Sequence, residues 1–239
     1  MRRRLLIFGL PVILAVSAVH LGTAGADVKP VEFSDARLKV EINATDGDAG
    51  LQVFLDGEAW NEVELLDPQG DAILDVDVTG RAEDFGLTEL FSESSEPPFA
   101  EFPLEQFKAL FPEGTYTFRG TTIDGVPITG AATLTHDFPD GPQILSPAAD
   151  SRVRPDQVVV RWSPVTTPAG IDIAGYQVLV VQEEPVLRVF SADLPATATR
   201  LSVPAEFLQP RTEYKVEVLA VEVGGNQTLT ELTFRTRAA

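Results

Sequence analysis

The chain has 239 residues, a length that suits one or two domains. It carries 36 Asp and Glu residues against 18 Lys and Arg residues, so its formal net charge is −18. Phosphate backbones and anionic lipid surfaces would repel such an acidic chain, and this argues against nucleic-acid binding. There are no cysteines, which excludes disulfides, thiolate chemistry and cysteine-ligated zinc.

The N-terminus has the three parts of a secretory signal peptide. Three basic residues, Arg2–Arg4, precede an apolar run over Leu5–Val19, and Ala24-Gly25-Ala26 forms a small-residue cleavage site before Asp27. The run is short for a transmembrane helix, although an uncleaved N-terminal anchor is the alternative. We therefore expect a signal-peptide helix over 1–26, export to the periplasm or beyond the cell, and no membrane attachment after cleavage.

Residues 27–141 read as a first domain of short antiparallel strands. Apolar and polar residues alternate, as in strands with one buried face, over Leu38–Ile42, Leu51–Leu55, Ala72–Val78 and Ile128–His136. Turn sequences such as Asp56-Gly57 separate these runs. The stretch Pro112–Phe118 resembles the late-strand signature of bacterial immunoglobulin-like modules, which implies a β-sandwich.

Residues 81–111 interrupt this alternation. Two groups have helical spacing: Leu87, Leu90 and Phe91, and then Leu104, Phe107, Leu110 and Phe111. Pro112 and Gly114 follow the second group and would end a helix there. We expect two short helical turns on an excursion from the first sandwich.

Residues 142–239 read as a second sandwich. Apolar residues alternate at Val158, Val160 and Trp162, at Tyr176, Val178 and Val180, and at Tyr214, Val216, Val218 and Ala220. Turn residues bound each run, a spacing typical of short antiparallel strands. The fold class expected for the whole chain is therefore all-β, with two antiparallel β-sandwich domains in tandem.

Five segments of the second half, in order, make it resemble a fibronectin type III domain from about Pro142 to Arg237. A tyrosine that opens a strand, Tyr214, follows Leu208 and Pro210, as in a tyrosine corner whose hydroxyl binds upstream backbone. The resemblance implies seven strands in two sheets and a spacer or binding role without catalysis. We also expect Trp162 and Tyr214 to be core anchors.

Four aspartates of the first half are candidate calcium ligands. Asp46 and Asp48 lie in a turn, and Asp75 and Asp77 share one face of a strand. Carboxylate oxygens are the ligands that calcium prefers, but the spacing does not fit an EF-hand loop. The alternative is a set of solvated acidic residues in an acidic protein.

A candidate partner-binding patch lies in the excursion. Phe99 and Phe102 stand beside Glu96 and Glu101, which gives an apolar patch with an acidic rim. Such a patch suits a basic or cation-bridged partner. The alternative is that the two phenylalanines only pin the excursion onto the sandwich.

Catalytic motifs are scarce. His136 is the one histidine left after signal cleavage, and no Gly-x-Ser-x-Gly sequence occurs. We expect a non-catalytic exported module that binds a cell-envelope, carbohydrate or protein partner, with no cofactor other than calcium. The alternative is a small exported hydrolase that uses carboxylates of the first domain.

Overall fold

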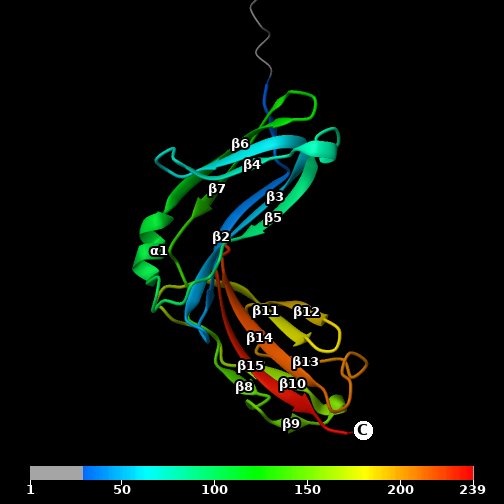
Figure 1. Cartoon of the computed structure of the whole chain (residues 1–239). Helices are drawn as coiled ribbons and strands as arrows, with labels where there is room; N and C mark the ends of the chain where they lie inside the picture. The colour runs from blue at the N-terminus through cyan, green and yellow to red at the C-terminus, as the bar shows by residue number, and fades with distance from the viewer. Residues whose placement is uncertain (1–28, 239) are drawn as a thin grey trace, which may run out of the picture.

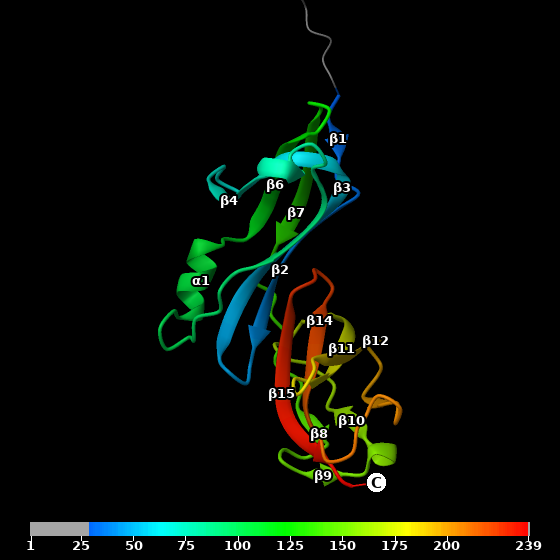
Figure 2. The same cartoon turned by 45° about the vertical axis from the view of Figure 1, so that its right-hand side comes forward.

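The computed structural model describes residues 29–238, so the expected signal segment over 1–26 lies outside the described residues. Within 29–238, no helix is both long enough and apolar enough to cross a membrane. In this part of the chain, strands dominate, and there is one short α-helix, α1 (Leu104–Leu110). Figures 1 and 2 show two β-rich halves that meet where β2 and β15 lie side by side.

The first half is organised around one long strand. Its strands are β1 (Val31–Glu32), β2 (Asp35–Asn43), β3 (Asp48–Leu66), β4 (Ala72–Asp77), β5 (Leu87–Glu93), β6 (Gly114–Thr122) and β7 (Pro127–Leu134). The beginning of β3 lies between β2 and β5, whereas its end lies between β4 and β6. The β3–β5 register shifts between Asp56 and Trp60, and the single strand thus serves two layers. Their inward-facing apolar side chains form one core.

The excursion differs from expectation in its first part. Residues 87–93 form strand β5, which pairs with β3, so the predicted helical turn at Leu87, Leu90 and Phe91 is wrong. Leu90 packs against the core while Phe91 is 59% exposed, as the alternation of a strand requires. Pairing with β3 outweighs a helical spacing that spans little more than one turn. The second helical group is confirmed by α1, whose Phe107 is buried.

The second half packs two layers around its own core. Its strands are β8 (Ile144–Ser146), β9 (Arg152–Val153), β10 (Val159–Trp162), β11 (Ile173–Gln182), β12 (Arg188–Pro195), β13 (Arg200–Ser202), β14 (Glu213–Glu222) and β15 (Gln227–Thr236). One layer has the order β13-β10-β8, and the other has the order β15-β14-β11-β12. Tyr214, Val216, Val218 and Ala220 of β14 face the core between them.

The two expected anchors of this core are confirmed. Trp162 and Tyr214 are 1% and 0% exposed. The Tyr214 hydroxyl accepts a hydrogen bond from the Gln209 backbone N–H at 2.7 Å, which closes the expected tyrosine corner. A related contact closes in the first half, where the Tyr116 hydroxyl donates to the Pro112 carbonyl at 2.9 Å.

Candidate functional site at the junction of the two halves

One sheet runs through both halves. β15 pairs with β2 in parallel, with Gln227 opposite Glu41 and Leu229 opposite Asn43. The pairing continues into the β2–β3 turn, where the Ala44 N–H donates to the Leu229 carbonyl at 2.9 Å. Through the beginning of β3, the strand order across the junction is β5-β3-β2-β15-β14-β11-β12, and the end of β3 continues the sheet into β6, β7 and β1. The halves are therefore joined by sheet hydrogen bonds as well as by their linker.

A buried asparagine in the β14–β15 turn completes this junction. Asn226 is 2% exposed, and its side-chain oxygen accepts a hydrogen bond from the Val40 N–H at 2.9 Å. Its side-chain nitrogen donates to the carbonyl and the hydroxyl oxygen of Thr135, both at 3.0 Å. The Glu222 carboxylate holds the turn in shape by accepting from the N–H groups of Gly224 and Asn226. The amide of one half is thus satisfied by groups of the other half.

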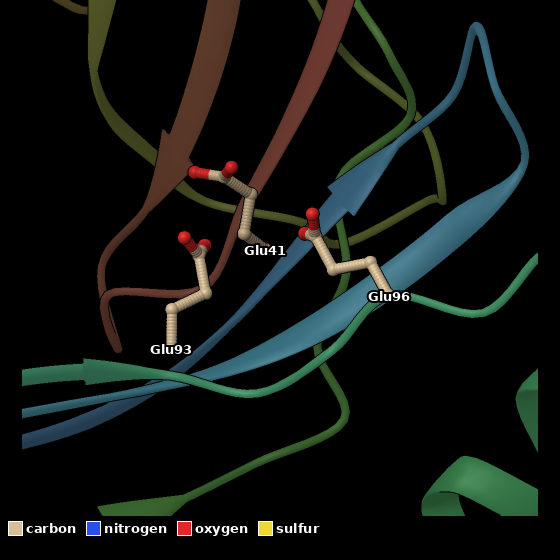
Figure 3. A group of neighbouring side chains, drawn as sticks. All are labelled: Glu41, Glu93 and Glu96. Carbon is tan, nitrogen blue, oxygen red and sulfur yellow. The ribbon is translucent and has the colours of Figure 1, made fainter.

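Three carboxylates converge on the sheet beside this junction (Figure 3). Glu41 lies on β2, Glu93 ends β5, and Glu96 lies in the loop that follows. Each contributes an oxygen, and these oxygens all lie within 4.8 Å of one another. We call these three residues the glutamate trio. Within residues 29–238, it is the one group of three or more acidic or histidine side chains close enough to share an ion.

A glycine makes room for the glutamate trio. Gly50 on β3 lies directly opposite Glu41 on β2, so both occupy the same face of the sheet. A Cβ atom at Gly50 would lie 2.9 Å from the Glu96 Oε1 atom, closer than ordinary van der Waals contact. The Glu96 side chain therefore fills the space that a larger residue at position 50 would take.

Amide side chains and one lysine partly compensate the charge of the trio. Gln52 donates a hydrogen bond to Glu93 at 2.6 Å, and Gln227 donates across the junction to Glu41. The oxygen of the Gln227 amide accepts from Lys39 Nζ at 2.8 Å. Gln52 and Gln227 are 7% and 6% exposed, so these two amides are shielded from water, whereas Glu93 and Glu96 remain exposed. The trio is thereby tied to β15 of the second half.

The surroundings of the trio disfavour the negative charge of its carboxylates. Partial burial, followed by the charges of Glu93, Asp48, Glu41 and Asp46, raises the pKa of Glu96 to about 7. Burial also raises the pKa of Glu41 and lowers the pKa of Lys39. Near neutral pH, Glu96 is therefore protonated in a large fraction of molecules. Chemically, the trio can share a proton or attract a cationic group.

The raised pKa predicts that acidification stabilises this region. The ordinary pKa of Glu96 is 4.5 and its folded pKa is about 7, so the folded chain binds more protons between these pH values. We expect the free energy of unfolding to fall as the pH rises from 4.5 towards 7. Glu96→Gln should flatten this dependence in urea titrations over that range. Glu101→Gln, an exposed change in the same loop, should preserve it, and an equal slope in both variants would contradict the prediction.

The four candidate aspartates do not come together. Asp46 and Asp48 lie at the β2–β3 turn, where their charges reach Glu96. Asp75 and Asp77 lie on β4 opposite Glu64 and Glu62, near the other end of β3. Nearly the whole length of β3 separates the two pairs, so one calcium ion cannot bind all four. Only the first pair borders the glutamate trio.

The candidate partner patch also divides. Phe99 and Phe102 are partly buried against the first core, and the Phe99 N–H donates to the Gly47 carbonyl at 2.7 Å. Glu101 remains exposed, and Glu96 joins the trio. Sequence reasoning missed Glu41 because it reads as an ordinary residue on the solvent-facing side of a strand, and it missed Glu93 because that residue reads as part of an irregular loop. The alternation of β2 could place Glu41 on the face away from Val40 and Ile42. It could not reveal which residues of other elements lie beside Glu41 on that face.

The fold and the junction define a chain of two β-modules that share one sheet. Residues 142–235 match the family model described as "Fibronectin type III domain", and they form such a domain here. No curated protein matches the chain.

Two solved structures match parts of the chain at low similarity. The FN1-FN3 domains of chicken CNTN1 match at 13% identity and a TM-score of 0.35, over 87% of this chain and 65% of that one. A tetra-tandem repeat in the extending region of a large adhesion protein matches at 14% identity and a TM-score of 0.31, over 85% of this chain and 50% of that one. The chain thus spans less than two thirds of either structure.

Proposed function

We propose that this chain is an exported, non-catalytic module that holds a binding face at a fixed angle for a cell-envelope, carbohydrate or protein partner. The observation that carries the proposal is the junction, where β2 and β15 pair and Asn226 is buried between the halves. A spacer needs no such junction, because a linker alone would connect two domains. A shared sheet restricts their relative motion and keeps one continuous face in register.

The geometry of the trio supports binding over hydrolysis. A carboxylate-pair glycosidase places its two carboxyl groups on either side of the bond to be cleaved. Here Glu41 and Glu93 lie on one face of the sheet, and Glu96 converges on them from the following loop, so the three carboxylates approach a bound group from one side. Glu93 and Glu96 are exposed on a sheet face, not enclosed in a pocket.

Binding and hydrolysis can be separated in one assay. The mature chain 27–239 would be incubated with envelope fractions and soluble polysaccharides, and retention and product release would be measured together. We expect saturable retention without product. Product release that a Glu41→Gln and Glu93→Gln double variant abolishes would contradict the proposal and favour the hydrolase.

The basic and apolar N-terminus supports export. We expect the protein recovered outside the cytoplasm to begin at or near Asp27, and intact-mass measurement of that fraction checks this. Recovery of membrane-bound protein that retains Met1–Ala26 would instead show an uncleaved anchor. The mature chain would lose three arginines and no acidic residue, so export leaves it still more acidic.

A further inference from the structure

Strand β5 is one of the edge strands of the sheet that crosses the junction. It pairs with β3 along one side, and within residues 29–238 no strand pairs with its other side. Leu87 and Leu90 pack against the first core and hold the strand in place. Edge strands are often protected by proline, lysine or a bulge, and the seven residues of β5 include no proline or lysine. An ordered strand with unpaired backbone groups is therefore available for pairing.

The side chains that β5 presents have a definite pattern. Glu89, Phe91 and Glu93 share one face of the strand, the face that also carries Phe54 and Gln52 of β3. Phe91 is 59% exposed, and Arg37 lies 4.3 Å from the centre of the Phe54 ring beside it. The edge thus offers an acid, an aromatic ring and an acid at alternate positions. Its last acid belongs to the glutamate trio, where negative charge already accumulates.

We propose that β5 binds an extended, basic segment of a protein partner by strand addition. This proposal rests on the proposed binding function and specifies the kind of partner that would bind. A strand added beside β5 would place its own side chains opposite Glu89, Phe91 and Glu93. Lysine or arginine opposite the two acids and an apolar residue opposite Phe91 form favourable cross-strand pairs.

A second copy of the chain is a poor occupant of this edge. Antiparallel pairing of two β5 strands centred on Phe91 would set Glu89 of each copy against Glu93 of the other, and like charges in these positions destabilise a sheet. The net charge of −18 adds repulsion between whole molecules. A basic segment instead relieves the charge held by the trio.

The edge strand of the second half, β12, supplies an internal control. Among the described residues no strand pairs with the outer side of β12, and its side chains differ from those of β5: Val189 is 49% exposed, and Arg188 and Asp193 carry opposite charges. This edge has no alternating acidic pattern. A basic strand that recognises side chains as well as free backbone should therefore choose β5.

The test uses the mature chain 27–239 and the synthetic peptide Thr-Lys-Thr-Val-Thr-Lys-Thr, whose pattern is the same in both directions. Binding is measured by calorimetry at low and high salt. Two control peptides replace both lysines by glutamate, or replace the two threonines beside valine by proline. The second control keeps the charge but cannot pair as a strand. Amide hydrogen exchange locates the bound peptide.

We expect the lysine peptide to bind more weakly as salt rises and to protect 87–93 but not 188–195 from exchange. Glu89→Lys with Glu93→Lys should weaken binding by about tenfold, since each favourable charge pair becomes a repulsive one. Glu184→Lys with Glu206→Lys changes the net charge equally at exposed sites of the second half and should leave binding unchanged. Circular dichroism checks that both double variants remain folded.

Three outcomes would overturn the proposal. These are failure of the wild-type chain to bind the lysine peptide, equal binding of the proline peptide, and protection of β12 in place of β5. Failure here would leave the proposed fixed angle between the halves intact, since the junction is measured separately. A flexible junction with normal peptide binding would instead overturn the fixed angle and keep the β5 surface.

Discussion

Replacement of Trp162 by alanine is expected to lower the free energy of unfolding by about 3–5 kcal/mol, the usual range for a large buried aromatic side chain. Trp162 is 1% exposed, and its ring lies 5.4 Å from the ring of Tyr176 in the second core. The loss is a large share of the roughly 5–15 kcal/mol that stabilises a typical domain. Urea unfolding followed by circular dichroism measures it.

Glu217→Ala is the matched control on strand β14. Glu217 lies on the face opposite the core and contacts Lys215 at 2.8 Å, while Glu231 and Glu183 also lie near that lysine. Its removal should cost less than about 0.5 kcal/mol, as for most surface substitutions. Similar losses for Trp162→Ala and Glu217→Ala would contradict the placement of the core.

Asn226→Ala is expected to lower the free energy of unfolding and to weaken the coupling between the two halves. The substitution leaves the Val40 N–H and the Thr135 carbonyl without their partner in a buried place. Each unsatisfied buried group costs about 1–3 kcal/mol, so we expect a loss of about 2–4 kcal/mol. Gln177→Ala, which removes an exposed hydrogen bond to Asp193, should cost much less.

The tryptophans make the coupling of the halves visible. Trp60 is buried in the first core and Trp162 in the second, and they are the only two in the chain. Trp60→Phe and Trp162→Phe variants therefore report one half each. With Asn226 present, both should report the same urea midpoint, and Asn226→Ala should split the midpoints. Separate midpoints before the substitution would show that the junction does not couple the halves.

The second half could be predicted from sequence to the level of individual side chains. Alternation marked Val158, Val160 and Trp162 as inward-facing, and Tyr214 stood at the start of its strand with turn residues upstream. Period-2 patterns carry this information because each strand has one buried face and one wet face. Local chemistry also located α1, since Pro112 and Gly114 end its apolar spacing.

Two features could not be predicted in this way. The spacing of Leu87, Leu90 and Phe91 fits a helical turn as well as a strand, and only the neighbouring β3 decides between them. The junction joins Glu41 to Gln227, which are 186 positions apart, and neither strand names its partner. The glutamate trio depends on that long-range pairing and on the space at Gly50. The positions of acidic residues in the sequence therefore pointed to the four aspartates instead.

The most direct test of the fixed angle is a distance measurement between the halves. The chain has no cysteines, so Gln69→Cys and Thr197→Cys, both at exposed turns, would provide two clean sites for spin labels. Pulsed electron resonance on the labelled chain 27–239 should give one narrow distance distribution, which broadens when Asn226→Ala is added. A broad distribution in the chain that retains Asn226 would contradict a rigid junction.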